Sequence, residues 1–257
     1  MKTFHKISFS FIILLISVIL NISGCSSSGE KINTDDPEKA FEIAKRKFDR
    51  GKYVDAIEDF SLIKVVFPGT SVIEKAQFYI AESYFYQKEY LLAAYEYENF
   101  LKDHSVSELY PDARYKLALT YYNLSPKYSL DQEFTRLAIN EFLGYLEQFP
   151  QGKYVNDVET KVKELRNKLA YKDFVIAENY LKLNIYRSAA IYFESVYENY
   201  LESDWADEAM VGHAEALING RKYEEAGKIL DKFYKYFPKS DLKTKADNLL
   251  RILKENI

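Results

Sequence analysis

The side chains that carry out most enzyme chemistry are scarce in this sequence. Its 257 residues contain one cysteine, Cys25, and three histidines, His5, His104 and His213. His5 lies in an apolar N-terminal segment, His104 in an expected turn between helices, and His213 beside a small residue on an expected helix. There is no glycine-rich phosphate loop and no His/Cys spacing typical of a metal site. Adjacent acidic residues fall near helix starts, where they offset the helix dipole. We therefore expect no enzyme activity, no cofactor and no metal.

Cys25 is the one residue to which the sequence assigns a reaction. Lys2 and Lys6 precede an apolar run over residues 7–22, and small residues precede Cys25, which together are typical of a secretory signal. The segment Ile22–Cys25 (Ile-Ser-Gly-Cys) resembles the lipobox of bacterial lipoproteins. That resemblance implies cleavage before Cys25 and diacylation of its thiol. An uncleaved membrane anchor is the alternative, for which about 20 apolar residues would be needed.

The rest of the chain repeats one spacing of small, aromatic and helix-ending residues. An alanine is followed 9 residues later by tyrosine, 12 later by a second alanine, and 24 later by proline or a similar stop. Two antiparallel helices need a small residue on each where they approach closely, and proline cannot continue a helix. The regular copies begin at Ala44, Ala81, Ala177 and Ala214, and a copy stretched in its first half begins at Ala118.

This spacing predicts an all-α fold: a right-handed superhelical solenoid of five tetratricopeptide-like helix pairs plus a C-terminal capping helix. Eight extra residues in the third copy predict an exposed loop over residues 123–130. Fourteen extra residues before the fourth copy predict a long helix over 156–183, because two added heptads nearly preserve the face that meets the core. The expected segments are a signal peptide 1–24, a flexible tether 25–36, repeats 1–3 in 37–150, and repeats 4–5 with the cap in 151–257.

Charge and repeat phase indicate the kind of partner. The formal net charge of −4 argues against nucleic acid, whose backbone requires a basic face. A stacked helical array instead offers a groove lined by the first helix of each pair, which suits an extended peptide. One of the residues predicted to face the groove, Phe78, could instead lie in the core between helices. The residues predicted to face this groove are Lys45, Lys75, Phe78, Glu82 and Tyr86.

Two stretches carry a resemblance to a known family. The matching residues are Asp131-Gln132, Thr135, Ala138, Phe149-Pro150 and Tyr154 in the first stretch, and Leu169-Ala170, Phe174, Ala177, Tyr180, Tyr186 and Ala189-Ala190 in the second. Together with the lipobox, these stretches resemble the BamD family, the lipoproteins of the outer-membrane β-barrel assembly machinery. The sequence departs from the family at Ile191-Tyr192, where an Asn-Arg pair is frequent, and at Leu201, where the family has proline.

The resemblance implies a scaffold on the periplasmic face of the outer membrane, anchored by lipid. Its C-terminal repeats would bind the periplasmic POTRA region of the barrel subunit BamA, and its N-terminal repeats would receive unfolded barrel proteins. Tyr186, Arg187 and Arg221 lie at expected helix turns of repeats 4 and 5 and are of types that often dominate interfaces. Two alternatives stay open: a periplasmic adaptor of a cell-wall or Tol-type complex, and a small glycan-binding lipoprotein.

Overall fold

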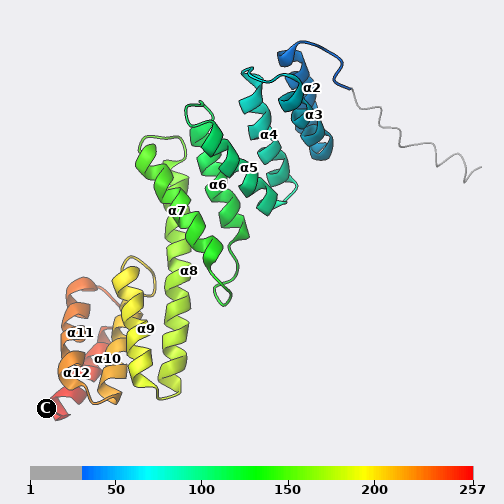
Figure 1. Ribbon diagram of the computed structural model, residues 1–257. Helices are drawn as coiled ribbons and strands as arrows, with labels where there is room; N and C mark the ends of the chain where they lie inside the picture. The colour runs from blue at the N-terminus through cyan, green and yellow to red at the C-terminus, as the bar shows by residue number, and fades with distance from the viewer. Residues whose placement is uncertain (1–30, 257) are drawn as a thin grey trace, which may run out of the picture. The chain divides into compact units, whose positions relative to one another are not determined.

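The computed structural model describes residues 31–256, and Figure 1 shows this part of the chain as a series of α-helices joined by short connections. The helices are α2 (Pro37–Asp49), α3 (Tyr53–Val66), α4 (Val72–Tyr86), α5 (Tyr90–Asp103), α6 (Tyr110–Leu124), α7 (Glu133–Gln148), α8 (Val155–Lys182), α9 (Tyr186–Asn199), α10 (Ala206–Asn219), α11 (Tyr223–Tyr236) and α12 (Lys243–Asn256). The predicted all-α fold is confirmed: α2 to α11 make the five expected pairs, and α12 follows them.

The repeated alanines lie where helices meet. Each of them is fully buried, which explains why the sequence keeps the smallest side chain with a Cβ at both helix contacts of every pair. A larger side chain there would force the two helices apart. The buried positions are Ala44, Ala56, Ala81, Ala93, Ala118, Ala138, Ala177, Ala189, Ala214 and Ala226.

Four of the five turns within pairs share one helix ending. Each places one residue in the left-handed region, with φ of 74° at Gly51, 64° at Lys88, 58° at Asn184 and 60° at Arg221. The next residue donates its backbone N–H to a carbonyl five positions earlier; in the last turn, Lys222 N lies 2.8 Å from Leu217 O. This arrangement gives hydrogen-bond donors to backbone carbonyl groups at the end of the first helix, and it reverses the chain direction within a few residues.

The third pair is connected differently. The predicted exposed loop is present at residues 125–132, where Lys127, Ser129, Leu130 and Asp131 are exposed, and contacts from α8 also hold it in place. Lys168 Nζ lies 2.6 Å from Ser125 Oγ, and Lys172 Nζ lies 2.6 Å from the Leu130 carbonyl oxygen. The Tyr128 ring also packs edge-on against Tyr171, with the ring centroids 4.6 Å apart.

The long helix α8 is confirmed to within one residue at either end. Its buried side chains recur at helical spacing, at Val158, Val162, Leu165 and Leu169, and then continue through Phe174. In Figure 1, α8 runs beside α7 along its first part and beside α9 along its second part. Because of the two added heptads, α8 is long enough to pack against α7 of the third pair and also against α9, its own partner in the fourth pair.

The predicted capping helix is also confirmed. Ala246, Leu249 and Leu253 of α12 are buried, and α12 contacts both α10 and α11. It thereby covers the apolar face that the last pair would otherwise present to water. Among the helices described, none is long and apolar enough to span a bilayer.

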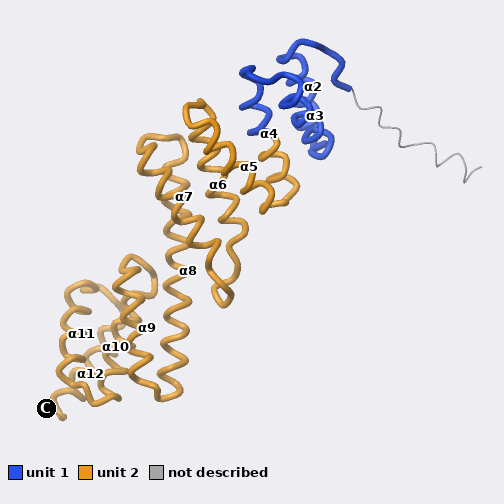
Figure 2. The backbone as a smooth tube through the Cα atoms, viewed as in Figure 1, with its two compact units in different colours: residues 1–79 blue, residues 80–257 orange. Residues whose placement is uncertain are grey.

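The chain forms two compact units, residues 1–79 and 80–257, which are coloured separately in Figure 2. The division falls within α4. The predicted boundary at residue 150 lies inside the second unit and stays a prediction. The signal peptide, Cys25 and most of the predicted tether lie outside the described residues.

Candidate partner-binding site

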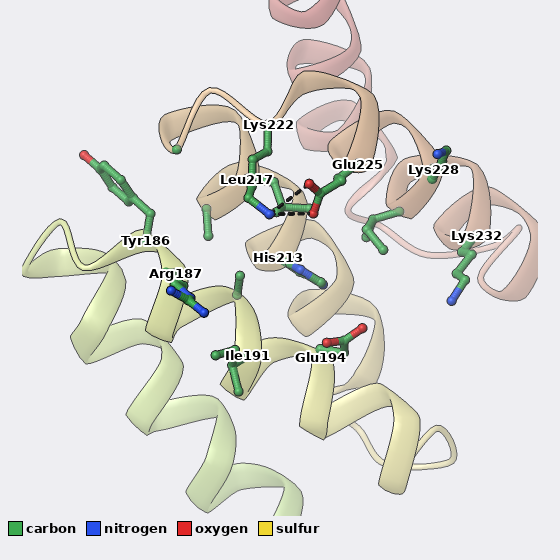
Figure 3. A pocket seen from close by; sticks show the side chains of 14 residues that line it. Tyr186, Arg187, Ile191, Glu194, His213, Leu217, Lys222, Glu225, Lys228 and Lys232 are labelled. Atoms are coloured by element: carbon green, nitrogen blue, oxygen red, sulfur yellow. Dashed lines mark hydrogen bonds and ion pairs between the residues drawn. The ribbon is translucent and has the colours of Figure 1, made fainter.

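The second unit contains a cavity of about 560 Å³ bounded by α9, α10 and α11. Its floor is apolar, and its rims carry charged side chains from α9 on one side and from the start of α11 onward on the other, as Figure 3 shows. The lining residues are Tyr186, Arg187, Ala190, Ile191, Glu194, His213, Ala216, Leu217, Gly220, Lys222, Glu225, Lys228, Ile229 and Lys232. The repeat pattern predicted a groove lined by the first helix of each pair, whereas the second helices α9 and α11 supply most of this lining.

Close packing of α9 on α10 sets the shape of the floor. A side chain at Gly212 would meet the Phe193 ring at 2.6 Å, so only glycine lets this buried ring lie against α10. The same packing brings the small Ala190 and Ala216 to the floor, where they leave space. Ile191 is 57% exposed despite its apolar side chain.

Two of the predicted partner-binding residues reach this cavity. Tyr186 and Arg187 begin α9, two and three residues after the left-handed Asn184, and the Tyr186 hydroxyl lies 2.8 Å from Asn184 Oδ1. In Figure 3 the Tyr186 ring points away from the other labelled side chains, while Arg187 lies nearer to them. Arg221 does not line the cavity; it occupies the α10–α11 turn between the lining residues Gly220 and Lys222.

The rims carry an excess of positive charge. Four lining residues are basic and two, Glu194 and Glu225, are acidic. Lys222 pairs with Glu225 at 2.8 Å, whereas Lys228 and Lys232 pair with carboxylates outside the lining, Glu224 and Glu198. Within residues 31–256, Arg187 makes no ion pair with a carboxylate. The cavity therefore fits an apolar segment that also carries a carboxylate.

His213 lies under the cavity and is 5% exposed, in line with its predicted place at the edge of the core. Its Nδ1 lies 2.8 Å from the Tyr197 hydroxyl and shares a hydrogen bond with it. Burial lowers the pKa of His213 to about 4, because the charged imidazolium would lose its hydration; Lys232 and Lys222 also lower it, and Glu225 opposes them.

This lowered pKa predicts a loss of stability in mild acid. The folded pKa lies below the ordinary value of 6.5, so the unfolded chain binds the proton more tightly. Stability from His213 is then complete above about pH 6.5 and is lost as the pH falls through 4. Between pH 7 and pH 5, urea unfolding should show the native chain losing about 2 kcal/mol more than a His213→Gln variant. Equal losses would mean that His213 titrates normally.

In the first unit, the predicted groove residues are mostly engaged with their neighbours. The Lys45 ammonium pairs with Asp49 and lies 5.1 Å from the Tyr79 ring centroid. Lys75 Nζ lies 3.6 Å from a Glu38 carboxylate oxygen. Phe78 is only 7% exposed and occupies the core position that was its alternative.

In the second unit, the other two predicted groove residues differ sharply. Tyr86 is 49% exposed, with Lys116 Nζ 5.3 Å from its ring centroid. Glu82 is 6% exposed; it accepts a hydrogen bond from the Tyr97 hydroxyl and pairs with Lys116 at 2.8 Å. Glu82 is thus part of a buried network rather than an open surface. Over the described range, no three His, Cys, Asp or Glu side chains are placed to hold a metal ion.

Comparison with known proteins gives a consistent result. The family model YfiO, described as an outer membrane lipoprotein, matches residues 33–219, and a tetratricopeptide-repeat model matches residues 208–240. The outer membrane protein assembly factor BamD of Rickettsia prowazekii is 29% identical over 192 residues, which are 75% of this chain and 76% of that protein. BamD of Vibrio cholerae is 22% identical over 204 residues, covering 75% and 84%, and BamD of Caulobacter vibrioides is 21% identical over 218 residues, covering 83% and 72%.

Proposed function

Because the chain belongs to the YfiO family of outer membrane lipoproteins, the family of the BamD assembly factors, we propose that it is a scaffold of the machinery that assembles β-barrel proteins in the outer membrane. The family match over residues 33–219 carries this proposal, since it spans most of the helical repeats. The protein is held on the periplasmic face by acylated Cys25, and it acts by binding rather than by catalysis.

The C-terminal repeats bind the periplasmic POTRA region of a BamA-like barrel subunit. The start of α9 supports this assignment because it combines the residue types that dominate protein interfaces. Leu183, Ile185 and Ile191 are 66%, 45% and 57% exposed, and they flank Tyr186 and Arg187. The adjoining cavity offers an apolar floor for a side chain of the partner and basic rims for its carboxylates.

The N-terminal repeats receive segments of unfolded barrel proteins. Exposed aromatic and aliphatic side chains at Tyr86 and on α5 support this role, since extended barrel segments alternate apolar and polar residues. Leu91, Leu92 and Tyr95 of α5 are 63%, 47% and 60% exposed. Such side chains provide contacts without requiring one particular sequence.

A triple substitution in the full-length chain tests the partner site. Replacing Tyr186, Arg187 and Arg221 together by alanine should weaken binding to the purified periplasmic domain of the cognate barrel subunit at least tenfold, because tyrosine and arginine are the commonest hot-spot residues. The measurement is the dissociation constant by biolayer interferometry. Urea unfolding of the variant checks that the repeats remain folded.

A matched triple variant in the N-terminal repeats supplies the control. Tyr95, Arg50 and Arg136 are exposed, and replacing them by alanine removes the same side-chain types. This control should bind the barrel subunit within about twofold of the native chain, as expected for surface positions outside an interface. Weaker binding of the control alone would reverse the proposed division of labour and leave the family assignment intact.

A further inference from the structure

Helix α3 in the first unit is apolar on both of its faces. Ala56, Phe60 and Ile63 are buried against the rest of the pair. On the opposite side, four aliphatic residues face water: Val54 is 59% exposed, Leu62 45%, Val65 77% and Val66 52%. Aliphatic side chains gathered on an exposed surface typically mark a contact with another molecule or with a membrane.

These exposed residues form one continuous strip. Side chains three or four positions apart lie on the same helix face, so Val54, Glu58, Leu62, Val65 and Val66 follow one another along α3. Glu58 is the acidic residue in this strip, and it lies toward the N-terminal half. The C-terminal end of α3, with Leu62, Val65 and Val66, is therefore free of charged side chains on its outer side. We call these three residues the α3 tip.

The length of chain before the first helix limits what can cover the α3 tip. Twelve peptide units separate Cys25 from Pro37, where α2 begins. Even fully extended, they span at most about 43 Å, since each residue adds no more than about 3.6 Å. With Cys25 acylated in the outer membrane, the start of α2 therefore stays within that distance of the bilayer surface.

The charge of the first unit does not oppose a bilayer. Residues 26–79 contain nine lysines and arginines against ten acidic residues, whereas residues 80–257 contain 24 against 29. The part of the chain nearest the anchor is thus close to neutral, at −1, and the remainder carries −5. Arg50 and Lys52, both exposed, lie at the opposite end of α3 from its tip, so the charged end of the helix is kept away from the apolar contact.

We propose that the α3 tip rests in the headgroup region of the membrane to which the protein is anchored, with Leu62, Val65 and Val66 entering the acyl boundary. This inference rests on the proposed lipid anchor. The contact would fix the orientation of the first repeat relative to the bilayer, which acyl chains on a short tether cannot do alone. A partner helix or a second copy of the chain would be a different occupant of the same strip.

A spin label placed on the tip tests the proposal. Acylation of Cys25 leaves a cysteine introduced by Val65→Cys as the one free thiol in the full-length chain. The acylated protein is reconstituted in vesicles of phosphatidylethanolamine and phosphatidylglycerol at 3:1, and its vesicle association is measured by flotation. Collision of the label with oxygen and with a nickel chelate is then compared, because oxygen concentrates in the bilayer and the chelate in water. Oxygen collisions should dominate at position 65.

The control places the same label at Leu183→Cys, a position of similar exposure in the second unit. That label should favour the nickel chelate. If the protein floats but the two labels behave alike, the membrane contact is wrong while the anchor stands. If the label at 65 is shielded without vesicles in a concentration-dependent way, a second copy covers the tip and the proposal is overturned. Failure to float overturns both the anchor and this inference.

Discussion

A Cys25→Ser variant should lose all fatty-acid label. Cys25 is the single cysteine of the chain, so no other thiol can accept the acyl group. Cleavage at a lipobox requires the acylated cysteine, so the variant keeps the apolar run over residues 7–22 and stays with the membrane. Metabolic labelling with a fatty-acid analogue therefore measures the loss of the anchor, and fractionation alone does not.

Ser26→Ala is the matched control, since it changes the neighbouring residue and keeps the thiol. It should label and fractionate like the native chain. Two results would contradict the anchor: equal label in the Cys25→Ser variant, or no label in the native chain. Residues 1–24 still attached to the native chain, as read from its intact mass, would instead favour the uncleaved N-terminal anchor.

The elements of the fold were predictable where the signal is local and periodic. The alanine positions recur at fixed offsets because each helix pair solves the same packing problem, and all of them are buried as that reasoning requires. The extent of α8 followed from counting inserted heptads, which leave the buried face nearly unchanged. The capping helix followed from the same need to cover an apolar face.

Features that depend on distant partners were not predictable in this way. The 125–132 loop has polar, turn-forming residues typical of exposure, but Lys168 and Lys172 bind it from more than 40 positions away. The cavity floor likewise needs Ala190 of α9 and Ala216 of α10 together, and these two residues are 26 positions apart. A residue's position in the repeat predicts which side of its helix it lies on. It does not predict how deeply a charged side chain at that position is buried.

Glu82 shows this limit most clearly. Its position in the repeat predicted a groove-facing carboxylate, yet it is buried beside Lys116 and the Tyr97 hydroxyl. Burial is the main reason that the pKa of Tyr97 is raised well above 10, and the Glu82 charge raises it further. The network joins α4, α5 and α6, so it stabilises the second and third repeats rather than offering charge to a substrate.

Lys116→Met should therefore destabilise the protein by about 3–5 kcal/mol, as expected when one partner of a buried ion pair is removed and the other charge stays behind. Lys116 and Glu82 side chains are only 16% and 8% exposed, so water cannot replace the lost ammonium. Equilibrium urea unfolding measures the loss. Lys127→Met, on the exposed loop surface, is the control and should change the unfolding free energy by no more than about 0.5 kcal/mol.

A second substitution shows whether Lys116→Met destabilises the protein by leaving the Glu82 charge buried without a partner or by removing a packing contact. In the double variant Lys116→Met with Glu82→Gln, no buried charge remains, and the amide can still accept the hydrogen bond from Tyr97. Most of the stability should return, and the double-variant cycle should give a coupling energy of about 1–3 kcal/mol between the two positions. If the stability losses of the two single variants simply add in the double variant, then the broken ion pair is not the cause of the destabilisation. A Lys116→Met variant as stable as the native chain would mean that Glu82 reaches water, and its predicted place in a substrate groove would regain support.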